Sequence, residues 1–294
     1  MAGLTAAMYT GRHGLRTLVI ERLMAGNQII NVERIENFPG FTEGVSGAEL
    51  SPLIQEQAMN AGAEFVMDEV TGLALDGAYK VVTTHSGSCR ARALIVAAGS
   101  SLKKLGVPGE DELYGRGISH CATCDGPMFK GEVVGVVGGG DSAADEAMTL
   151  TEYTDKVVLF HRRDQLRAQK ALQSRVLAHP RIDIVFNTVV ESVLGDEVVR
   201  AVNVRNVVTN LTNRMSLSGL FVYVGLEPNT GFVQGVLKTD NAGHIPVDLR
   251  METTVPGLFA AGDIRQHSSS QLASAAGDGA TAAMGAVRHL SGPG

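Results

Sequence analysis

The fold is decided by residues 133–143, which read Val-Val-Gly-Val-Val-Gly-Gly-Gly-Asp-Ser-Ala. The first five residues form a nearly continuous apolar run, which is typical of a buried parallel strand. Three glycines follow, and the chain then takes on a helical pattern over Ser142–Thr149. A strand, a glycine turn and a helix in this order form the unit that binds a dinucleotide in α/β proteins.

Within this stretch, Gly138, Gly140 and Ala143 occupy the three small positions of a GxGxxA loop. The first glycine permits a tight turn, and the second lets the backbone approach a pyrophosphate. The third small residue lets the helix pack on the strand, and the N–H groups at the helix start, near Ser142, favour an anion. An ordinary strand-to-helix turn has the same spacing, so the prediction of a nucleotide site depends on the strand and helix that flank the loop.

Basic residues follow the next expected strand, Lys156–Phe160. They are His161, Arg162, Arg163 and Arg167. Proteins that bind NAD have an acidic residue at this point, which accepts hydrogen bonds from the ribose. Proteins that bind NADP have cationic residues there, which bind the 2′-phosphate. Guanidinium groups suit a phosphate, so the sequence favours NADPH. The alternative is a solvated basic start to the helix that we expect over Asp164–Leu177.

The opening of the chain has features of a second nucleotide loop. Residues Ala2–Ala7 are typical of the helix that follows such a loop, with Gly3 as its third glycine. A short apolar strand then ends at Glu21, near the ~20-residue spacing of a ribose-binding acid. We expect this domain to lack its first strand and first two glycines; an ordinary N-terminal helix is the alternative.

Strands and helices alternate along the rest of the chain, which favours parallel α/β sheets and two nucleotide-binding halves. Breaks in the pattern fall at Val107–Gly109 and Pro228–Thr230. The run Ala93–Ala98 is expected to be a buried parallel strand. Helices are expected over 1–12, 47–62 and 272–290, and strands over 17–20, 64–67, 70–73, 79–84, 182–186, 198–204, 221–224 and 257–260.

Residues 120–126 read His-Cys-Ala-Thr-Cys-Asp-Gly and contain a CxxC motif. A thiolate attacks a disulfide, and a second thiol at this spacing resolves the mixed disulfide. Asp125 could hold or deliver the proton that the exchange requires. Zinc bound by His120 with Cys121 and Cys124 would lack a fourth ligand, so no metal is predicted. The third cysteine, Cys89, is expected to be a small, partly buried residue.

Composition argues against several classes of partner. The 25 basic and 31 acidic side chains give a net charge of −6, so no overall positive field attracts nucleic acid or anionic lipid. Tryptophan is absent and Phe and Tyr number 9 and 5, which disfavours base-stacking surfaces. Glycine supplies 35 of 294 residues, against about 7% in an average protein, which agrees with several tight turns.

The same chain shows no signal for export or membrane insertion. Its longest apolar stretches are far below the ~20 residues of a membrane span, and Met1–Thr5 lacks the pattern of a signal peptide. Three cysteines do not suffice for the disulfide framework of a small secreted domain. We therefore expect a reducing, cytoplasmic compartment.

Taken together, these motifs resemble the low-molecular-weight, bacterial-type thioredoxin reductases, which are FAD/NAD(P)-binding pyridine nucleotide-disulfide oxidoreductases. The resemblance covers essentially the whole chain, in the order 2–7, 26–28, 36–40, 121–126, 138–143, 161–167, 257–263 and 275–280. Two departures concern side chains: Gly26-Asn27-Gln28 replaces the usual Gly-Gly-Gln, and Ser268–Ser270 stand where an Arg often precedes the glutamine at 271.

The resemblance implies two Rossmann-like, three-layer domains, one inserted into the other. An FAD-binding domain would comprise residues 1–109 and 230–294, and an NADPH-binding domain with the CxxC would comprise residues 110–229. A homodimer is implied, as are hinges at Gly106–Gly109 and Gly225–Thr230, because one dithiol must reach first the flavin and then thioredoxin.

The resemblance also assigns roles to residues. Cys124 would face the flavin, Asp125 would act as acid and base, and Cys121 would be the exchange partner, with the thiol that first meets the substrate left open. FAD would be bound by Gly3, Glu21, Gln28, Asn37, Gly99, Asp263, Gln271 and Leu272, with Asp263 accepting from the ribityl hydroxyls. NADPH would be bound by Gly138, Gly140, Ser142, Ala143, His161, Arg162, Arg163 and Arg167.

The implied reaction passes a hydride from NADPH to FAD, then two electrons to the Cys121/Cys124 disulfide, then reduces thioredoxin by thiol–disulfide exchange. One alternative is a related flavin-dependent dithiol oxidase or a disulfide reductase with another partner, although the arginine cluster favours NADPH. A second alternative is a non-catalytic nucleotide-binding or redox-sensing protein.

Overall fold

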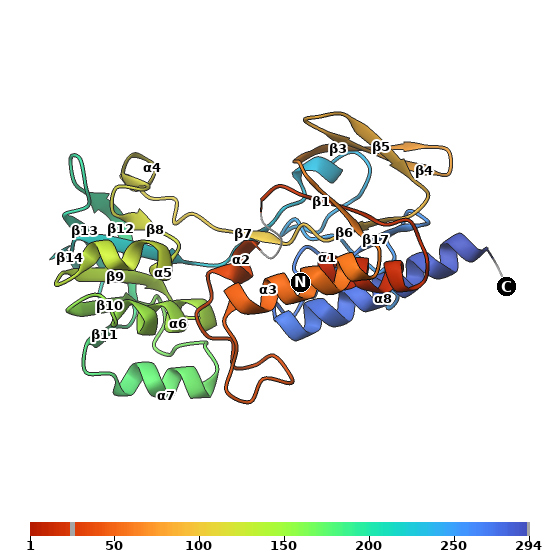
Figure 1. The fold of residues 1–294 in the computed structure, drawn as a ribbon. Coiled ribbons are helices and arrows are strands. Elements are labelled where there is room, and N and C mark those ends of the chain that lie inside the picture. Colours follow the sequence, from red (N-terminus) through yellow and green to blue (C-terminus); the bar gives the residue numbers. More distant parts are fainter. Residues whose placement is uncertain (24–26, 293–294) are drawn as a thin grey trace. The chain divides into compact units, whose positions relative to one another are not determined.

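The structure is a computed structural model that describes residues 1–23 and 27–292. The chain divides into two compact units: unit 1 comprises Met1–Ser101 and Glu227–Gly294, and unit 2 comprises Leu102–Leu226 (Figure 1). The sequence places the two boundaries after residues 109 and 229. Residues 102–109 group with unit 2, where the carbonyl of Pro108 accepts a hydrogen bond from the amide of Val193. The strands β7 (Ser100–Leu102) and β16 (Leu226–Pro228), where the chain passes between the units, pair with each other.

Unit 2 is built on a five-stranded parallel sheet in the order β11-β10-β9-β15-β8. The strands are β8 (Ile118–Ser119), β9 (Val133–Gly138), β10 (Lys156–Phe160), β11 (Ile182–Val185) and β15 (Gly219–Tyr223). The central strand β9 aligns Val134 with Val157 of β10 and with Gly219 of β15. The strands expected at 133–137 and 156–160 are therefore confirmed.

Alternate residues of β9 face opposite layers, because side chains of a strand alternate between its faces. Val134 and Val136 pack in a core with α6 (Asp141–Leu150) and α7 (Lys170–Ala178). Val137 packs in the other core, beneath an antiparallel sheet of β12 (Thr188–Leu194), β13 (Ala201–Asn206) and β14 (Thr212–Ser216). Unit 2 thus has three layers. Its short helices are α4 (Glu110–Leu113), α5 (Ala122–Asp125) and the 3₁₀ turn η1 (Gly126–Phe129).

Two expectations for unit 2 are wrong in extent. The strand expected at 198–204 begins only at Ala201, and the helix expected from Asp164 begins only at Lys170. Residues 164–169 instead return to the glycine turn, where the amides of Arg167 and Ala168 donate to the carbonyl of Gly139 at 2.6 and 3.1 Å. A helix over these residues would use the same amides for its own carbonyls, so the tertiary contacts override local helix propensity.

The strands of unit 1 form two parallel pairs and one antiparallel sheet. β1 (Leu18–Glu21) pairs with β2 (Glu64–Met67), and β6 (Leu94–Val96) pairs with β17 (Leu258–Ala260). The antiparallel sheet contains β3 (Val70–Asp76), β4 (Tyr79–Thr84) and β5 (Ser88–Ala91). In the described part of unit 1 the two parallel pairs are separate ladders.

The strand at 93–98 is parallel, as expected, but the expectation that it is buried is wrong for most of its length. Only Val96 is buried, the other members of the run are partly exposed, and Ala98 is exposed. Among the described strands, β6 has a hydrogen-bonded neighbour on one side only, so its other edge lacks the cover that a central parallel strand has.

Helices pack around these strands. They are α1 (Ala2–Arg12), α2 (Asn27–Ile30), α3 (Gly47–Asn60), the 3₁₀ turn η2 (Gly231–Val233) and α8 (Leu272–Ser291). Ser46 and Glu49 start α3 with a reciprocal capping box, a cap that typically contributes about 1 kcal/mol. α1 and α8 approach closely where Gly279 faces Ala2. The glycine permits this contact because a Cβ there would lie 2.2 Å from the carbonyl oxygen of Ala2. None of the described helices has both the length and the apolar content that a bilayer crossing requires.

Candidate functional site

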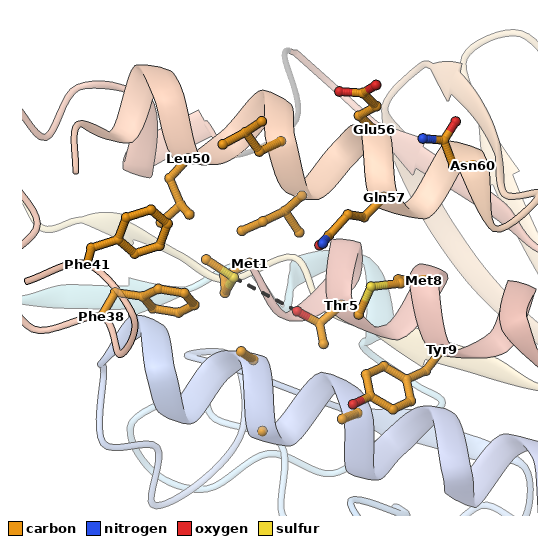
Figure 2. A pocket seen from close by; sticks show the side chains of 15 residues that line it. Met1, Thr5, Met8, Tyr9, Phe38, Phe41, Leu50, Glu56, Gln57 and Asn60 are labelled. Carbon is orange, nitrogen blue, oxygen red and sulfur yellow. Dashed lines mark hydrogen bonds between the residues drawn. The ribbon is translucent and has the colours of Figure 1, made fainter. Parts of the chain in front are cut away.

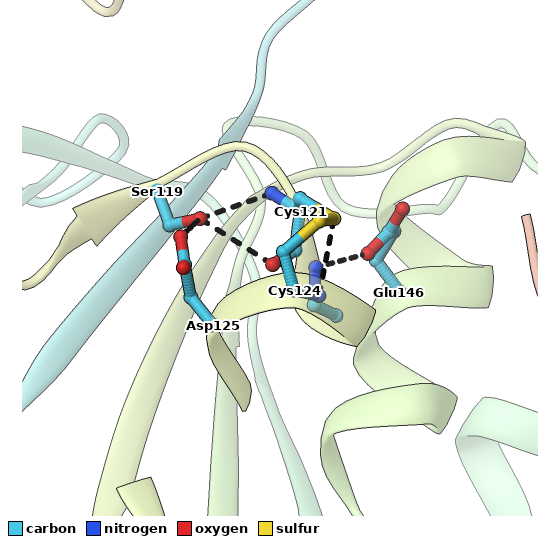
Figure 3. Close-up of a disulfide and its surroundings, with 6 residues drawn as sticks. Ser119, Cys121, Cys124, Asp125 and Glu146 are labelled. Atoms are coloured by element: carbon cyan, nitrogen blue, oxygen red, sulfur yellow. Dashed lines mark hydrogen bonds between the residues drawn. A yellow bond between two sulfur atoms is a disulfide. The ribbon is translucent and has the colours of Figure 1, made fainter. Parts of the chain in front are cut away.

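The CxxC motif forms a disulfide across the single turn of α5 in unit 2 (Figure 3). Cys121 is the N-cap of this turn, and its Sγ accepts a hydrogen bond from the amide of Cys124 at 3.2 Å. Cys124 is exposed and Cys121 is partly buried. The CxxC spacing brings the two sulfurs together because three residues span one helical turn, with the two Cα atoms 5.3 Å apart.

Asp125, the predicted acid and base, is tied to the disulfide through Ser119. The Ser119 hydroxyl donates to Oδ2 of Asp125 at 2.6 Å and accepts from the amide of Cys121 at 3.0 Å. Ser119 is buried at the end of β8, so its position is set by the sheet. Sequence reasoning missed Ser119; its place two residues before the first cysteine was the available signal.

A second carboxylate approaches the same turn from α6. Oε2 of Glu146 accepts a hydrogen bond from the amide of Ala122 at 2.7 Å (Figure 3). Tyr223, on β15, is buried beside it. Burial raises the pKa of Tyr223 far above its ordinary value, and the negative charge of Glu146 adds to this. Sequence reasoning identified neither residue, because both reach α5 only through the packing of unit 2.

The glycine loop that follows β9 combines close packing on one side with open space on the other. A Cβ at Gly138 would lie 2.6 Å from Cβ of Ala143 and 2.7 Å from the carbonyl oxygen of Tyr223, whereas a Cβ at Gly140 would meet nothing within 4 Å. Gly140 is the N-cap of α6, and Ser142 is exposed on the first turn. The loop therefore leaves room at the start of α6, where helix N–H groups favour a phosphate.

The predicted phosphate-binding cations fall into two groups. Arg162, Arg163 and Arg167 are exposed, and in the described part of the chain none of them has a carboxylate within ion-pair distance. His161 is buried, and its ring nitrogens face the carbonyl oxygens of Gly138 and Gln165 at 2.8 and 2.9 Å. The three guanidinium groups are thus free to bind an anion, while His161 supports the glycine loop.

In unit 1, two predicted FAD residues meet although they are far apart in the sequence. The side-chain amide of Asn37 donates to the side-chain oxygen of Gln271 at 3.0 Å. Gln271 is the N-cap of α8, and Leu272 begins that helix with its side chain packed against a core that includes Ile29 and Ile35. This brings Asn37, Gln271 and Leu272 to the start of one helix.

Asp263, the predicted ribityl acceptor, follows β17 and is partly buried. Burial raises its pKa, with a further contribution from the nearby Asp278 carboxylate. The Ser268 hydroxyl donates to Oδ1 of Asp263 at 3.1 Å. Charge interactions of the Met1 amino group with both Glu21 and Asp263 place these two predicted residues in one region of unit 1.

An ion pair that sequence reasoning missed holds the loop that carries Asp263. Nε and Nη2 of Arg265 donate to the two carboxylate oxygens of Asp278 on α8, at 2.6 and 2.9 Å. Asp278 also accepts from the amide of Gly262 at 3.1 Å. Asp278 is buried and Arg265 is partly buried, so this bidentate pair fixes the loop to α8.

The remaining predicted FAD residues are less informative. Gly3 lies in α1, where a Cβ would come 3.4 Å from Cβ of Ala97, and Gly99 follows β6 with a positive φ of 62°. Gln28 lies in α2, but its side chain is outside the part of the chain that the structure describes, as is Gly26 of the same motif. These residues stay predictions.

An apolar groove of about 620 Å³ lies between α1, α3 and α8 in unit 1 (Figure 2). Its lining includes Met8, Phe38, Phe41, Leu50 and Ile54. Among the residues whose side chains the structure describes, none of those predicted to bind FAD lines this groove, and most of its lining is apolar.

The third cysteine lies outside this chemistry. Cys89 is a free thiol in β5, partly buried, and burial raises its pKa. This agrees with the expectation of a small, partly buried residue. Among residues 1–23 and 27–292, no group of three or more His, Cys, Asp or Glu side chains has the arrangement of a metal site.

Comparison with known proteins gives one family. The family described as "Pyridine nucleotide-disulphide oxidoreductase" matches residues 1–280. The chain belongs to this family. A thioredoxin reductase of Bacillus subtilis is 44% identical over 289 residues, which cover 98% of this chain and 91% of that protein. A thioredoxin reductase of Treponema pallidum is 42% identical over 289 residues, which cover 98% and 94%.

Solved structures in this oxidoreductase family have the same α/β fold. The crystal structure of Lactococcus lactis thioredoxin reductase matches with a TM-score of 0.97 and 40% identity, covering 99% of this chain and 96% of that one. Thioredoxin reductase of T. acidophilum matches with a TM-score of 0.92 and 33% identity, covering 97% and 94%. The resemblance inferred from the motifs and the predicted fold class are both confirmed.

Proposed function

We propose that the protein is an NADPH-dependent flavoprotein disulfide reductase that reduces thioredoxin through Cys121 and Cys124. The observation that carries this proposal is the disulfide on α5, held in the same unit as an open glycine loop and three exposed arginines that have no carboxylate partner among the described residues. The thioredoxin reductases named above match this chain over nearly their whole length, which supports the same reaction and the same partner.

NADPH would be held in unit 2. Gly140 and the first turn of α6, including Ser142, would receive the pyrophosphate, because the space beside Gly140 is open. Arg162, Arg163 and Arg167 would bind the 2′-phosphate, since exposed guanidinium groups without carboxylate partners have hydrogen-bond donors to offer. His161 would hold the glycine loop in place through its hydrogen bond to the carbonyl oxygen of Gly138.

FAD would be held in unit 1. Asn37, Gln271 and the amide of Leu272 would contact it at the start of α8, and Asp263 would accept from its ribityl hydroxyls. Glu21, Gly3, Gly99 and Gln28 complete the proposed set. Bound FAD would supply a carrier that accepts a hydride from NADPH and passes two electrons to the disulfide.

The chain's own residues would perform the exchange. Two electrons and two protons convert the Cys121–Cys124 disulfide into two thiols. One of them, as a thiolate, attacks the disulfide of thioredoxin, forms a mixed disulfide and releases one thioredoxin thiolate. The other cysteine then attacks the mixed disulfide, which releases the second thioredoxin thiol and restores the Cys121–Cys124 bond. Asp125, held by Ser119, is placed to take and return the proton.

The test is NADPH oxidation by the purified protein with added FAD and thioredoxin. We expect turnover in the wild type, and flavin reduction without disulfide turnover in both Cys121→Ser and Cys124→Ser. The variant that retains the attacking thiol should accumulate a mixed disulfide with thioredoxin, which identifies that cysteine. The proposal fails if NADPH is not oxidised, or if the serine variants still reduce thioredoxin.

The same assay separates the two other functions that the motifs allow. Oxygen consumption with a dithiol substrate and no NADPH turnover would indicate a dithiol oxidase. Binding of NADPH without any flavin absorption band or FAD binding would indicate a non-catalytic protein.

Assembly and location belong to the same proposal. We propose a homodimer, which the family resemblance implies and which light scattering on the FAD-loaded protein would test. A cytoplasmic location agrees with the use of two of the three cysteines in a redox pair, and cell fractionation would test it.

A further inference from the structure

The dithiol turn α5 is bonded directly to the helix that begins at the glycine loop. Glu146, on the second turn of α6, accepts the amide hydrogen of Ala122 at 2.7 Å. Ala122 is completely buried, so this amide depends on a protein partner for its hydrogen bond. Figure 3 shows the Glu146 carboxylate reaching the first turn of α5, beside the disulfide.

The position of this carboxylate matters for the neighbouring sulfur. Ala122 follows Cys121, and Cys121 is the N-cap whose Sγ accepts from the amide of Cys124. N–H groups at such a turn stabilise a thiolate and lower the pKa of its thiol. A carboxylate on one of the same N–H groups takes up part of that positive potential and repels a negative sulfur.

Other titratable groups around α5 come from several elements. Asp125 lies on α5 itself and is held by Ser119. His120 precedes it, with its ring on the carbonyl of Val222. The ring of Tyr153 faces Gly126 of η1, and Tyr223 is buried on β15. The Tyr223 hydroxyl makes no hydrogen bond of standard geometry in the described part of the chain, so Glu146 acts on it chiefly through charge.

We propose that Glu146 is a positioning residue of the dithiol: it fixes the amide of Ala122 and, through its negative charge, opposes formation of a thiolate on Cys121. After reduction of the disulfide gives two thiols, Glu146 acts on the loss of a proton from Cys121. Its effect is to keep that thiol from becoming strongly acidic. A thiol whose pKa lies near the ambient pH is the most effective in exchange, because nucleophilicity falls as the pKa falls.

The experiment measures this thiol alone. In a full-length Cys89→Ser/Cys124→Ser background, Cys121 is the single cysteine, so its alkylation by iodoacetamide as a function of pH reports one titration. Glu146→Gln keeps an oxygen that can accept from Ala122 but removes the charge. We expect the midpoint of the pH profile to fall by about one pH unit, a tenfold increase in thiolate below the midpoint.

Matched variants separate charge from general disturbance. Glu152→Gln removes an exposed carboxylate just beyond α6 and should leave the midpoint unchanged. Glu146→Asp withdraws the carboxylate by one methylene and should give an intermediate midpoint, which also provides a result if Glu146→Gln does not fold. Midpoints equal to that of the Cys89→Ser/Cys124→Ser parent in the folded Glu146 variants, or an equal shift in Glu152→Gln, would overturn the proposal.

This inference rests on the proposed disulfide exchange, but its test needs neither FAD nor NADPH. A shifted midpoint, together with no thioredoxin reduction by the protein that retains both Cys121 and Cys124, would support the role of Glu146 and contradict the proposed function. An unshifted midpoint in a protein that reduces thioredoxin would do the reverse.

Discussion

Asn37 and Gln271 are joined by a side-chain hydrogen bond of 3.0 Å across 234 positions of the chain. Asn37 lies in the loop before α3, and Gln271 is the N-cap of α8. The bond therefore fixes a loop to the start of a helix whose first amides can donate to a ligand. It also joins two residues that the family resemblance assigns to FAD.

Loss of this bond should weaken FAD binding. In Asn37→Ala and Gln271→Ala, we expect the Kd for FAD to rise about two- to tenfold, from the net free energy of one hydrogen bond. Flavin fluorescence quenching on the apo-protein measures it. Asn60→Ala, an exposed amide at the end of α3, is the control and should bind FAD like the wild type. Wild-type affinity in both test variants would remove the pair from the FAD site.

The two glycines of the NADPH loop should respond differently to the same substitution. Gly138→Ala would force a Cβ against Ala143 and Tyr223, so the free energy of unfolding should fall by about 1–3 kcal/mol. Gly140→Ala places its Cβ in open space and should leave this free energy unchanged, while the Kd for NADPH rises about tenfold or more because the methyl group occupies the proposed phosphate position. Chemical denaturation and calorimetric titration measure the two effects. Unchanged NADPH affinity in Gly140→Ala would place the pyrophosphate elsewhere.

The arginines should discriminate between the two nicotinamide nucleotides. Arg162→Ala and Arg163→Ala should each raise the Kd for NADPH by about 10- to 100-fold, as expected for a charged hydrogen bond to phosphate. Affinity for NADH should not change, since NADH lacks the 2′-phosphate. Arg200→Ala, another exposed arginine of unit 2, controls for net charge. An equal loss of NADH affinity would assign the arginines a role other than recognising the 2′-phosphate.

Asp263 should make FAD binding sensitive to pH. Burial raises its pKa above the ordinary 3.8, so as the pH falls it takes up a proton earlier than an exposed aspartate does. The ionised carboxylate is the form that accepts hydrogen bonds from the ribityl hydroxyls. We therefore expect the affinity for FAD to fall as the pH is lowered, and the fall to begin at a higher pH than an aspartate with the ordinary pKa of 3.8 would give. Titrations of FAD binding at a series of pH values would show the fall in the wild type and its absence in Asp263→Asn.

The same raised pKa has the opposite sign for stability of the apo-protein. A carboxyl with a raised pKa in the folded state destabilises the fold above that pKa, and the cost disappears as the pH falls through it. Asp263→Asn should therefore bind FAD more weakly at neutral pH and yet unfold at an equal or higher temperature. A variant that loses both FAD affinity and thermal stability would point to a structural role for Asp263 instead.

Contiguous patterns in the sequence determined the β9–loop–α6 unit, the helices α1 and α8, and the dithiol. Each depends on neighbouring residues: β-branched residues favour the strand, glycines permit the turn, and two cysteines three residues apart span one helical turn. The short polar strand β14 left no such pattern, because it forms by pairing its backbone with β13. A tertiary contact also shortens the helix expected from Asp164. It begins only at Lys170, because the amides of Arg167 and Ala168 donate to the carbonyl of Gly139.

Only the tertiary structure decided what surrounds the chemistry. Ser119 and Glu146 reach α5 from β8 and α6, and Asn37 reaches Gln271 from the other end of the chain. The sequence alone identifies the two cysteines and the glycine loop, because each motif consists of residues that are neighbours in the chain. The hydrogen bonds and charges that adjust them come from residues that only folding brings together, since side chains distant in the sequence meet through the packing of sheets and helices rather than through spacing.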